Sequence, residues 1–432
     1  MENSNSTESR YALRALAMGI AAILLGLQIS AWVGFVPIIR DGHPDFRQLY
    51  TAGYMLRSGA WRQIYNYDAE LDFQNRVVSV AANALPFNHL AYEALIFAPL
   101  SVLPFRAAYF VFLAGNFALL YFVFRALSPD SLNLRTVWPL LPAALITTFL
   151  PIGACLMQGQ DSILLLALLC GGYVFIRRGQ PASAGALVAC GIFKFQLVIP
   201  LAVLLLLAGR KRFALGFAPV AGILTLLSVW VAGVAGTRIY LRDLLGMSVG
   251  LSTAEQRFRF GVVPTSMANL RGLVYGLMNW GGFTAGTQIA IALVSFAVLV
   301  FSVRAMSRMS RYSDAYLLGI VSASLLSYHF LIHDMSILAV PIAVVLDRFV
   351  LCERSARSIP TMAVWSAAFL FAAPMWMAVS ARTFFLVTVP VLLFFGVLAA
   401  AGARTSAAEI LAAGDEDAAG LFGRIDRGTR TA

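Results

Sequence analysis

Histidines and carboxylates, whose side chains can transfer protons and bind ligands, gather near the predicted ends of the apolar segments. All four histidines of the chain fall in such positions: His43, His89, His329 and His333. A second set of polar residues, from distant parts of the sequence, is predicted at the same face of the membrane. It comprises Asp41, Asp45, Gln158, Gln160, Asp161 and Asp334. Polar groups gathered at the helix ends of a membrane protein indicate a site. The alternative is that helix ends are simply polar.

Asp45 follows the first apolar segment, within the stretch from Arg40 to Tyr50. A carboxylate close to the membrane surface can remove a proton from a hydroxyl group, which makes Asp45 a candidate general base. The same residue precedes a predicted helix from Phe46 to Arg57. Capping the amino terminus of that helix is therefore the alternative interpretation.

Lys194 lies inside the apolar run Ala184–Leu207, and arginines flank this run on both sides. Both flanks are typical of cytoplasmic loops, so the run must enter the membrane and return as a short hairpin, with Lys194 near its turn. A lone lysine there is costly unless it is paired. The pattern favours an ammonium that faces a phosphate, and snorkelling to the interface is the alternative.

His333 and Asp334 lie where one predicted span ends and the next begins, and this pair would bind a phosphate or orient a sugar. One local His–Asp pair is too few ligands to predict a metal site. We therefore predict no cofactor and leave metal dependence open. The sequence contains no Walker loop, GxSxG or HExxH motif and no GxGxxG after a strand, so nucleotide-driven transport and use of a soluble nucleotide sugar gain no support.

The composition places these residues in a membrane protein. Of 432 residues, 60% are hydrophobic and 12% charged, whereas soluble domains have roughly 45–50% apolar and about 25% charged residues. The net charge is +11, and all but two of the 32 basic residues are Arg. Many of these arginines fall in short connections between apolar runs, which is typical of cytoplasmic loops and argues against a nucleic-acid partner.

Hydropathy predicts an all-α, polytopic transmembrane bundle. Besides the hairpin, the expected spans are Ala15–Val36, Ala107–Phe124, Val137–Met157, Ser162–Ile176, Phe213–Val234, Ile289–Val303, Ala315–Phe330, Met335–Phe349, Met362–Val379 and Phe384–Ala400. Residues 1–14 then form a cytoplasmic amino terminus, residues 15–401 the transmembrane domain, and residues 402–432 a disordered cytoplasmic tail. Two long outer loops, 37–106 and 235–288, are expected to form amphipathic helices at the membrane surface.

Several short motifs resemble glycosyltransferase family 87, a family of mannosyltransferase-like membrane enzymes. The resemblance begins at Asp45-Phe46 and continues through about residue 345. Its further motifs are Tyr50, Ala52-Gly53, Leu56, Gly59, Tyr65, Ala94 to Pro99, Leu103-Pro104, Gly159-Gln160-Asp161-Ser162, Lys194-Phe195-Gln196 and His333-Asp334. It departs from many relatives between Phe87 and Tyr92, where a Pro-rich stretch is missing, and this leaves the acceptor open.

The resemblance implies a GT-C-like fold with about 10–12 spans including the hairpin. It also implies an inverting hexosyltransferase that takes a sugar, mannose as the best guess, from a polyprenyl-phosphate donor to a lipid-linked or glycan acceptor. Asp45 matches the catalytic aspartate, and Lys194, His333, Asp334 and Gln160 are expected to bind the donor phosphate and sugar. The possible acceptor contacts are His43, Tyr50, Asn88, His89, Arg257 and Arg259.

The arginine distribution puts both termini in the cytoplasm and the site on the periplasmic or extracellular side of a bacterial inner membrane. Membrane lipids, the polyprenyl-phosphate sugar and the acceptor are then the partners. A lipid-linked sugar flippase or transporter is one alternative, but it would need polar groups across the whole membrane. An O-antigen-ligase-type enzyme is another, although its large loop lies between late spans.

Overall fold

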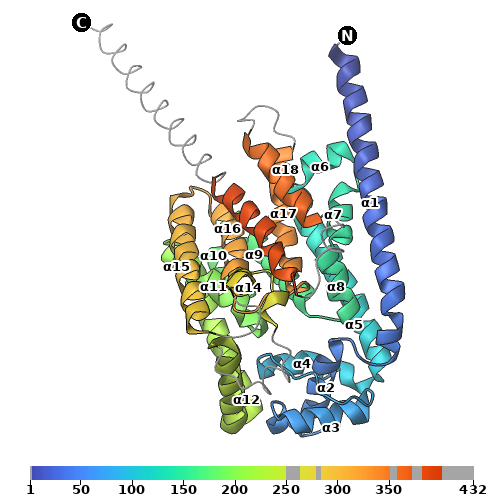
Figure 1. Ribbon diagram of the computed structural model, residues 1–432, viewed down its shortest axis with the longest axis vertical. Helices are drawn as coiled ribbons and strands as arrows, with labels where there is room; N and C mark the ends of the chain where they lie inside the picture. Colours follow the sequence, from blue (N-terminus) through green and yellow to red (C-terminus); the bar gives the residue numbers. More distant parts are fainter. Residues whose placement is uncertain (1, 250–262, 279–283, 351–357, 372–381, 401–432) are drawn as a thin grey trace, which may run out of the picture.

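The computed structural model describes residues 2–249, 263–278, 284–350, 358–371 and 382–400. Every regular element among these residues is a helix (Figure 1). The longer ones are α1 (Glu2–Arg40), α5 (Phe105–Leu127), α9 (Ser162–Arg177), α12 (Lys211–Val249), α15 (Ala285–Arg308), α16 (Tyr312–Leu326), α17 (Ala339–Val350) and α18 (Ser358–Phe371). The predicted all-α class is therefore confirmed.

Four helices are long and apolar enough to cross a membrane, and they contain Tyr11–Arg40, Phe105–Asp130, Lys211–Gly246 and Ala285–Arg308. Two bent pairs raise the number to six, and shorter apolar helices follow at Ser162–Arg177, Tyr312–Leu326 and Phe384–Ala400. Each predicted span overlaps one or more helices of the described residues, and the predicted Ala315–Phe330 ends earlier, at Leu326. Residues 372–379 lie outside the described residues. The first helix starts earlier than the predicted Ala15, at Glu2.

The predicted span Val137–Met157 is broken into α7 (Leu141–Thr148) and α8 (Leu150–Gln158), which meet at 54°. Pro151 lies in the first turn of α8. A proline there cannot continue the preceding helix because it has no amide hydrogen to donate. The break allows α8 to end beside the polar residues of the site.

The predicted hairpin is present as a second bent pair. α10 (Pro181–Ala189) and α11 (Phe195–Leu207) meet at 74° around a short 3-10 turn, Ile192–Lys194. Gly185 of α10 and Gly216 of α12 allow these two helices to pack backbone against backbone: a Cβ at Gly216 would lie 1.9 Å from the carbonyl oxygen of Ala182. This close packing fixes α10, and with it the turn that carries Lys194.

The loop between α1 and α5 folds into α2 (Phe46–Arg57), α3 (Tyr67–Val77) and α4 (Ala94–Phe97), which lie across one end of the bundle (Figure 1). Arg47 ties α2 to α3, because its buried guanidinium donates to the side chains of Gln74, Asn75 and Ser79 and to two carbonyls. A small apolar core around Phe46, Phe97 and Tyr109, distinct from the main core of the bundle, joins these helices to α5. The predicted short helices of this loop are confirmed.

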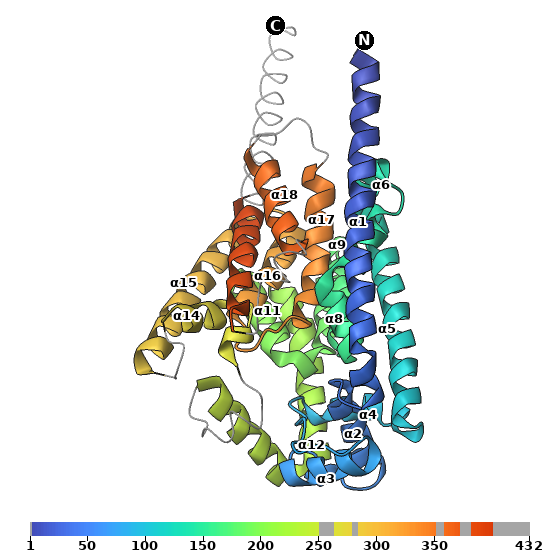
Figure 2. The same cartoon turned by 45° about the vertical axis from the view of Figure 1, so that its right-hand side comes forward.

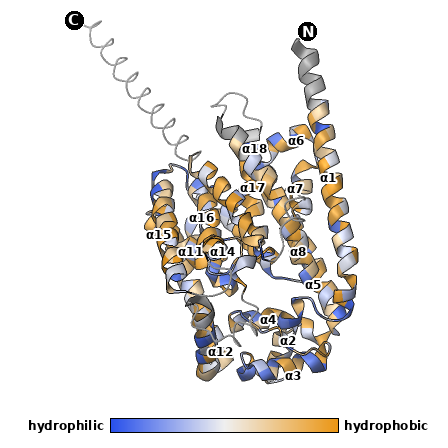
Figure 3. Ribbon diagram, in the orientation of Figure 1, coloured by the Kyte–Doolittle hydropathy of each residue, from blue (hydrophilic) through white to orange (hydrophobic). Residues whose placement is uncertain are grey.

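The second long loop differs in its first part from the prediction. The predicted span ends at Val234, and α12 breaks at nearly the same place, at Gly233. The φ of Gly233 is +70°, which only glycine adopts without strain. A second helical part of α12 then continues to Val249. The part after the break runs at the end of the bundle where α2 and α3 lie (Figure 2). Hydropathy colouring shows apolar helices through the bundle and hydrophilic residues collected on α2 and α3 (Figure 3). The loop helix α14 (Leu270–Met278) follows after residues outside the described ranges.

Candidate functional site

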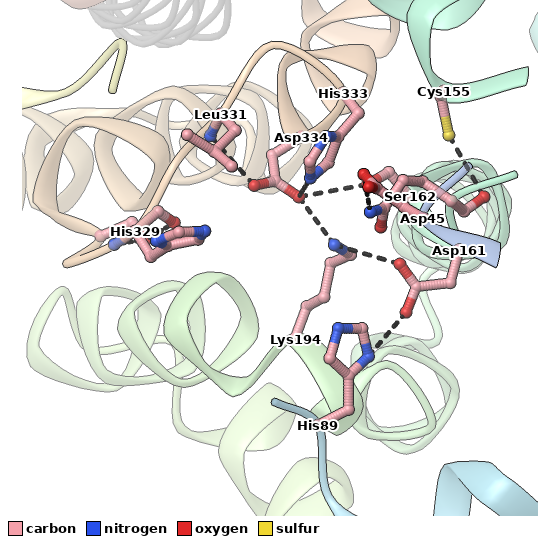
Figure 4. A network of polar contacts seen from close by, with 12 residues as sticks. Asp45, His89, Cys155, Asp161, Ser162, Lys194, His329, Leu331, His333 and Asp334 are labelled. Atoms are coloured by element: carbon pink, nitrogen blue, oxygen red, sulfur yellow. Dashed lines mark hydrogen bonds and ion pairs between the residues drawn. The ribbon is translucent and has the colours of Figure 1, made fainter. Parts of the chain in front are cut away.

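Five segments far apart in the sequence bring polar side chains together at the inner surface of the α2–α4 layer. They are the start of α2, residues 89–93, the turn between α8 and α9, the turn between α10 and α11, and residues 329–334 after α16. Figure 4 shows Asp45, Asp161, Lys194, His333 and Asp334 pointing toward one another, with His89 beside Asp161. We call this group the polar network.

Asp45 enters the network through Gln160, whose Nε2 donates a 2.7 Å hydrogen bond to its Oδ2. α8 ends at Gly159, which takes a left-handed conformation (φ +64°). A Cβ at Gly159 would lie 2.7 Å from the Cβ of Phe46. Glycine therefore both ends the helix and allows the turn to approach α2, so that Gln160 reaches the carboxylate of the neighbouring Asp45.

The capping interpretation of Asp45 gains no support. Asp45 occupies the N-cap position of α2, but its side chain makes no capping hydrogen bond. Its carboxylate is half-buried and bonded to Gln160 instead. A half-buried carboxylate that is held from one side can still meet a hydroxyl group from the other.

Lys194 lies between two carboxylates. Its Nζ is 2.8 Å from Asp334 Oδ1 and 3.0 Å from Asp161 Oδ1, and all three side chains are at most 3% exposed. Asp334 is further fixed by the Ser162 hydroxyl at 3.1 Å and the Leu331 amide at 3.1 Å. The lysine is thus paired within the protein rather than snorkelling, and a buried lysine needs such pairing.

His89 extends the network on the other side of Asp161. Its Nδ1 is 3.0 Å from Asp161 Oδ2 and 2.5 Å from Glu93 Oε2. Burial alone would lower the pKa of His89, but the carboxylates of Glu93 and Asp161 outweigh burial and raise this pKa. Burial raises the pKa of Glu93, whose side chain is fully buried.

His333 completes the network near Asp334. Its Nδ1 lies 3.1 Å from Gln158 Oε1, and its Nε2 lies 3.7 Å from Asp334 Oδ1. Burial lowers the pKa of this imidazole. Burial therefore favours the uncharged form of this ring.

The remaining predicted contacts lie elsewhere or outside the described residues. His43 is exposed in the turn after α1, and Asn88 is half-buried in the loop before α4. Tyr50 is buried, with its hydroxyl donating to the carbonyl of Leu103 at 2.8 Å. Arg257 and Arg259 lie outside the described residues.

Sequence reasoning missed Glu93 and gave Asp161 no role. Glu93 stands four residues after His89, a spacing that places two side chains on one face when the chain turns as a helix. That spacing was the available signal. Its meaning depends on Asp161, which approaches from another part of the chain.

The fold and the network define a helical membrane protein with a buried, charged polar site at one end of its bundle. Residues 92–332 match glycosyltransferase family 87. Since this is more than half of the chain, the chain belongs to that family, as predicted, and is a glycosyltransferase. The match includes Glu93, Gln160, Asp161 and Lys194, while Asp45, His333 and Asp334 lie outside it. Comparisons with curated proteins and with solved structures gave no match.

Proposed function

We propose that this glycosyltransferase moves a hexose, with mannose as the best guess, from a polyprenyl-phosphate donor to a lipid-linked or glycan acceptor. Asp45 accepts the proton of the acceptor hydroxyl. The hydroxyl oxygen bonds to the anomeric carbon as the bond from that carbon to the phosphate oxygen breaks. Attack opposite the phosphate inverts the anomeric configuration and releases polyprenyl phosphate.

The observation that carries this proposal is the position of Asp45. Its carboxylate is half-buried, is oriented by Gln160, and faces the same network as Lys194, Asp334 and His333 (Figure 4). A general base must lie close to the group that binds the leaving phosphate, because both act on one sugar carbon. The network supports this requirement with residues that are distant in sequence.

We assign Lys194 and His333 to binding the phosphate of the sugar donor. An ammonium has three N–H donors, and Lys194 uses two on Asp161 and Asp334. One donor remains for a phosphate oxygen, and the His333 ring lies nearby, 3.7 Å from Asp334 Oδ1. We assign Asp334 and Gln160 to positioning Lys194 and Asp45 respectively.

We further propose that the network faces the periplasm or the extracellular side of a bacterial inner membrane, with both termini in the cytoplasm. Arg125, Arg177, Arg210 and Arg348 lie at or near helix ends on the side away from the α2–α4 layer. Cytoplasmic loops carry the excess of such residues. The polyprenyl chain would then lie in the bilayer beside the bundle.

The test is sugar transfer by Asp45→Asn, assayed with a polyprenyl-phosphate sugar and membrane extract as acceptor. Asparagine keeps the shape but cannot accept the proton, so we expect a loss of about 10²–10⁴-fold in the rate with donor binding retained. Asp41→Asn is the matched control, because Asp41 is an exposed aspartate of the same loop. Transfer by Asp45→Asn at the rate of the control would remove Asp45 from the mechanism.

The donor assignment has its own test. Lys194→Ala should weaken donor binding, whereas Lys211→Ala, which changes the exposed lysine at the start of α12, should not. Donor affinity that is equal in both variants would make Lys194 a structural residue. Substrate flux in liposomes without a glycosylated product would instead favour the flippase alternative.

A further inference from the structure

His89, Glu93 and Asp161 form a compact set of potential ligand atoms beside the proposed transfer site. One ligand atom from each residue lies within 4.8 Å of the other two. All three side chains are buried, at 12% exposure or less. They come from two segments, residues 89–93 and the turn between α8 and α9, so the fold itself brings the set together.

The orientation of the imidazole requires a proton or a cation between these groups. A single nitrogen, Nδ1 of His89, lies 2.5 Å from Glu93 Oε2 and 3.0 Å from Asp161 Oδ2. A lone pair on that nitrogen would face two carboxylate oxygens and be repelled by both. Either a proton or a metal ion must therefore lie there.

The charge of the buried groups can be balanced in two ways. The buried network holds three carboxylates, Glu93, Asp161 and Asp334, against the single ammonium of Lys194. With His89 protonated and all three acids ionised, the cluster keeps one uncompensated negative charge, unless Glu93 is protonated as well. A divalent ion bound by a neutral His89 balances all three carboxylates and Lys194 without a further proton.

Glu93 supplies a second, independent indication. Its Oε1 atom is buried and has no hydrogen-bond partner among the described residues. A buried carboxylate oxygen that lacks a partner is unfavourable. A metal ion can take the second oxygen of the same carboxylate as well as the first.

We propose that His89, Glu93 and Asp161 bind one divalent transition-metal ion, with Zn²⁺ or Mn²⁺ as the ions that suit one imidazole and two carboxylates. Such a set of three protein ligands leaves further coordination positions open. The ion would lie next to Asp161, which also holds Lys194. This inference goes beyond the proposed function, because metal binding does not depend on which sugar is transferred.

The experiment measures metal content in full-length protein purified in detergent, stripped with a chelator and then exposed to ZnCl₂ or MnCl₂. We expect one ion per chain by elemental mass spectrometry. Glu93→Gln and His89→Gln should lower the affinity by more than the roughly 10- to 100-fold that loss of an outer-shell partner costs. Glu70→Gln is the matched control, because Glu70 is a buried carboxylate of the same loop that bonds the Phe87 amide instead of a histidine.

A second readout uses the wild-type protein and so does not depend on the folding of a variant. If the ion replaces protons on His89 and Glu93, its binding releases protons, and the calorimetric heat then varies with the ionisation enthalpy of the buffer. Substoichiometric binding of both metals by wild-type protein would overturn the proposal. So would equal affinity in Glu93→Gln and Glu70→Gln. Neither result involves sugar transfer, so failure here is distinguishable from failure of the proposed function.

Discussion

At the scale of single residues, Gln160 decides where the proposed base points. Its Nε2 donates to Asp45 at 2.7 Å, while its Oε1 is buried without a hydrogen-bond partner among the described residues. The one bond that this side chain makes is thus the bond to the carboxylate. Gln160 is a positioning residue in the proposed reaction.

Gln160→Leu should therefore slow transfer without changing donor affinity. A hydrogen bond to a charged group contributes about 1.5–3 kcal/mol, which corresponds to a fall of roughly 10- to 100-fold in kcat. Initial rates over a range of donor concentrations separate kcat from KM. A change confined to KM would show that Gln160 binds the donor instead.

The pairing of Lys194 predicts a stability effect that is separate from catalysis. Lys194→Met leaves Asp334 buried without its ammonium and leaves Asp161 with His89 alone. Removal of one partner from a buried pair costs about 3–5 kcal/mol. We expect a lower melting temperature in detergent, whereas Lys211→Met should have little effect. Adding Asp334→Asn to Lys194→Met should recover part of the loss, and purely additive losses would show that the two groups are not coupled.

At the scale of elements, the contact between α10 and α12 holds the lysine turn in place. Gly185 and Gly216 lie so close to the opposite backbone that neither tolerates a Cβ without movement. Since α10 leads directly into the turn with Lys194, a shift of this helix moves the lysine relative to Asp161 and Asp334. Two residues without side chains thus control the geometry of the charged network.

Gly216→Ala should consequently destabilise the fold and reduce transfer together. The new methyl group would lie 1.9 Å from the Ala182 oxygen, so the helices must separate. Gly222→Ala is the control within α12, since no atom lies within 4 Å of a Cβ there. That change should stabilise the helix by about 0.5–1 kcal/mol. Equal melting temperatures for the two variants would contradict this account of the helix contact.

Hydropathy and loop composition predicted most of the elements, because each span must satisfy its own length and apolar content. The hairpin at Lys194 was predictable from its arginine flanks. The position of Asp45, His333 and Asp334 at the same end of the bundle was predictable from where the spans end. The pairing of Lys194 with Asp161 was not predictable, since it depends on how α9 and α10 pack. The same limitation hid Glu93, which gains its meaning only where Asp161 approaches His89.

At the scale of the whole molecule, the polar network lies at the end of the bundle that carries the α2–α4 layer, and the helix ends near Arg125, Arg177, Arg210 and Arg348 lie on the other side. α1 has little protein around it: in its most apolar window only 11% of residues are buried. Its remaining surface must face lipid, which fixes the bundle upright in the bilayer. In the orientation proposed above, the polar network faces the outer side of the membrane.

The proposed orientation predicts opposite labelling of two introduced cysteines. In a background with Cys190 and Cys352 replaced by Ala, Ser58→Cys after α2 should react with a membrane-impermeant maleimide in intact cells. Arg178→Cys after α9 should react only after the membrane is opened. Both positions are exposed in the structure, so burial would not explain a difference. The reverse pattern would place the network in the cytoplasm and rule out the proposed sidedness.

The distribution of the network along the chain also bears on how the protein is made. Asp45, Asp161, Lys194 and Asp334 emerge from the ribosome in that order, and 140 residues separate the last two. Until the turn after α16 is inserted, Lys194 has only one of its two carboxylate partners. A fragment that ends between Lys194 and Asp334 therefore holds this lysine with a single carboxylate, and the pairing of Lys194 is complete only once Asp334 has been made.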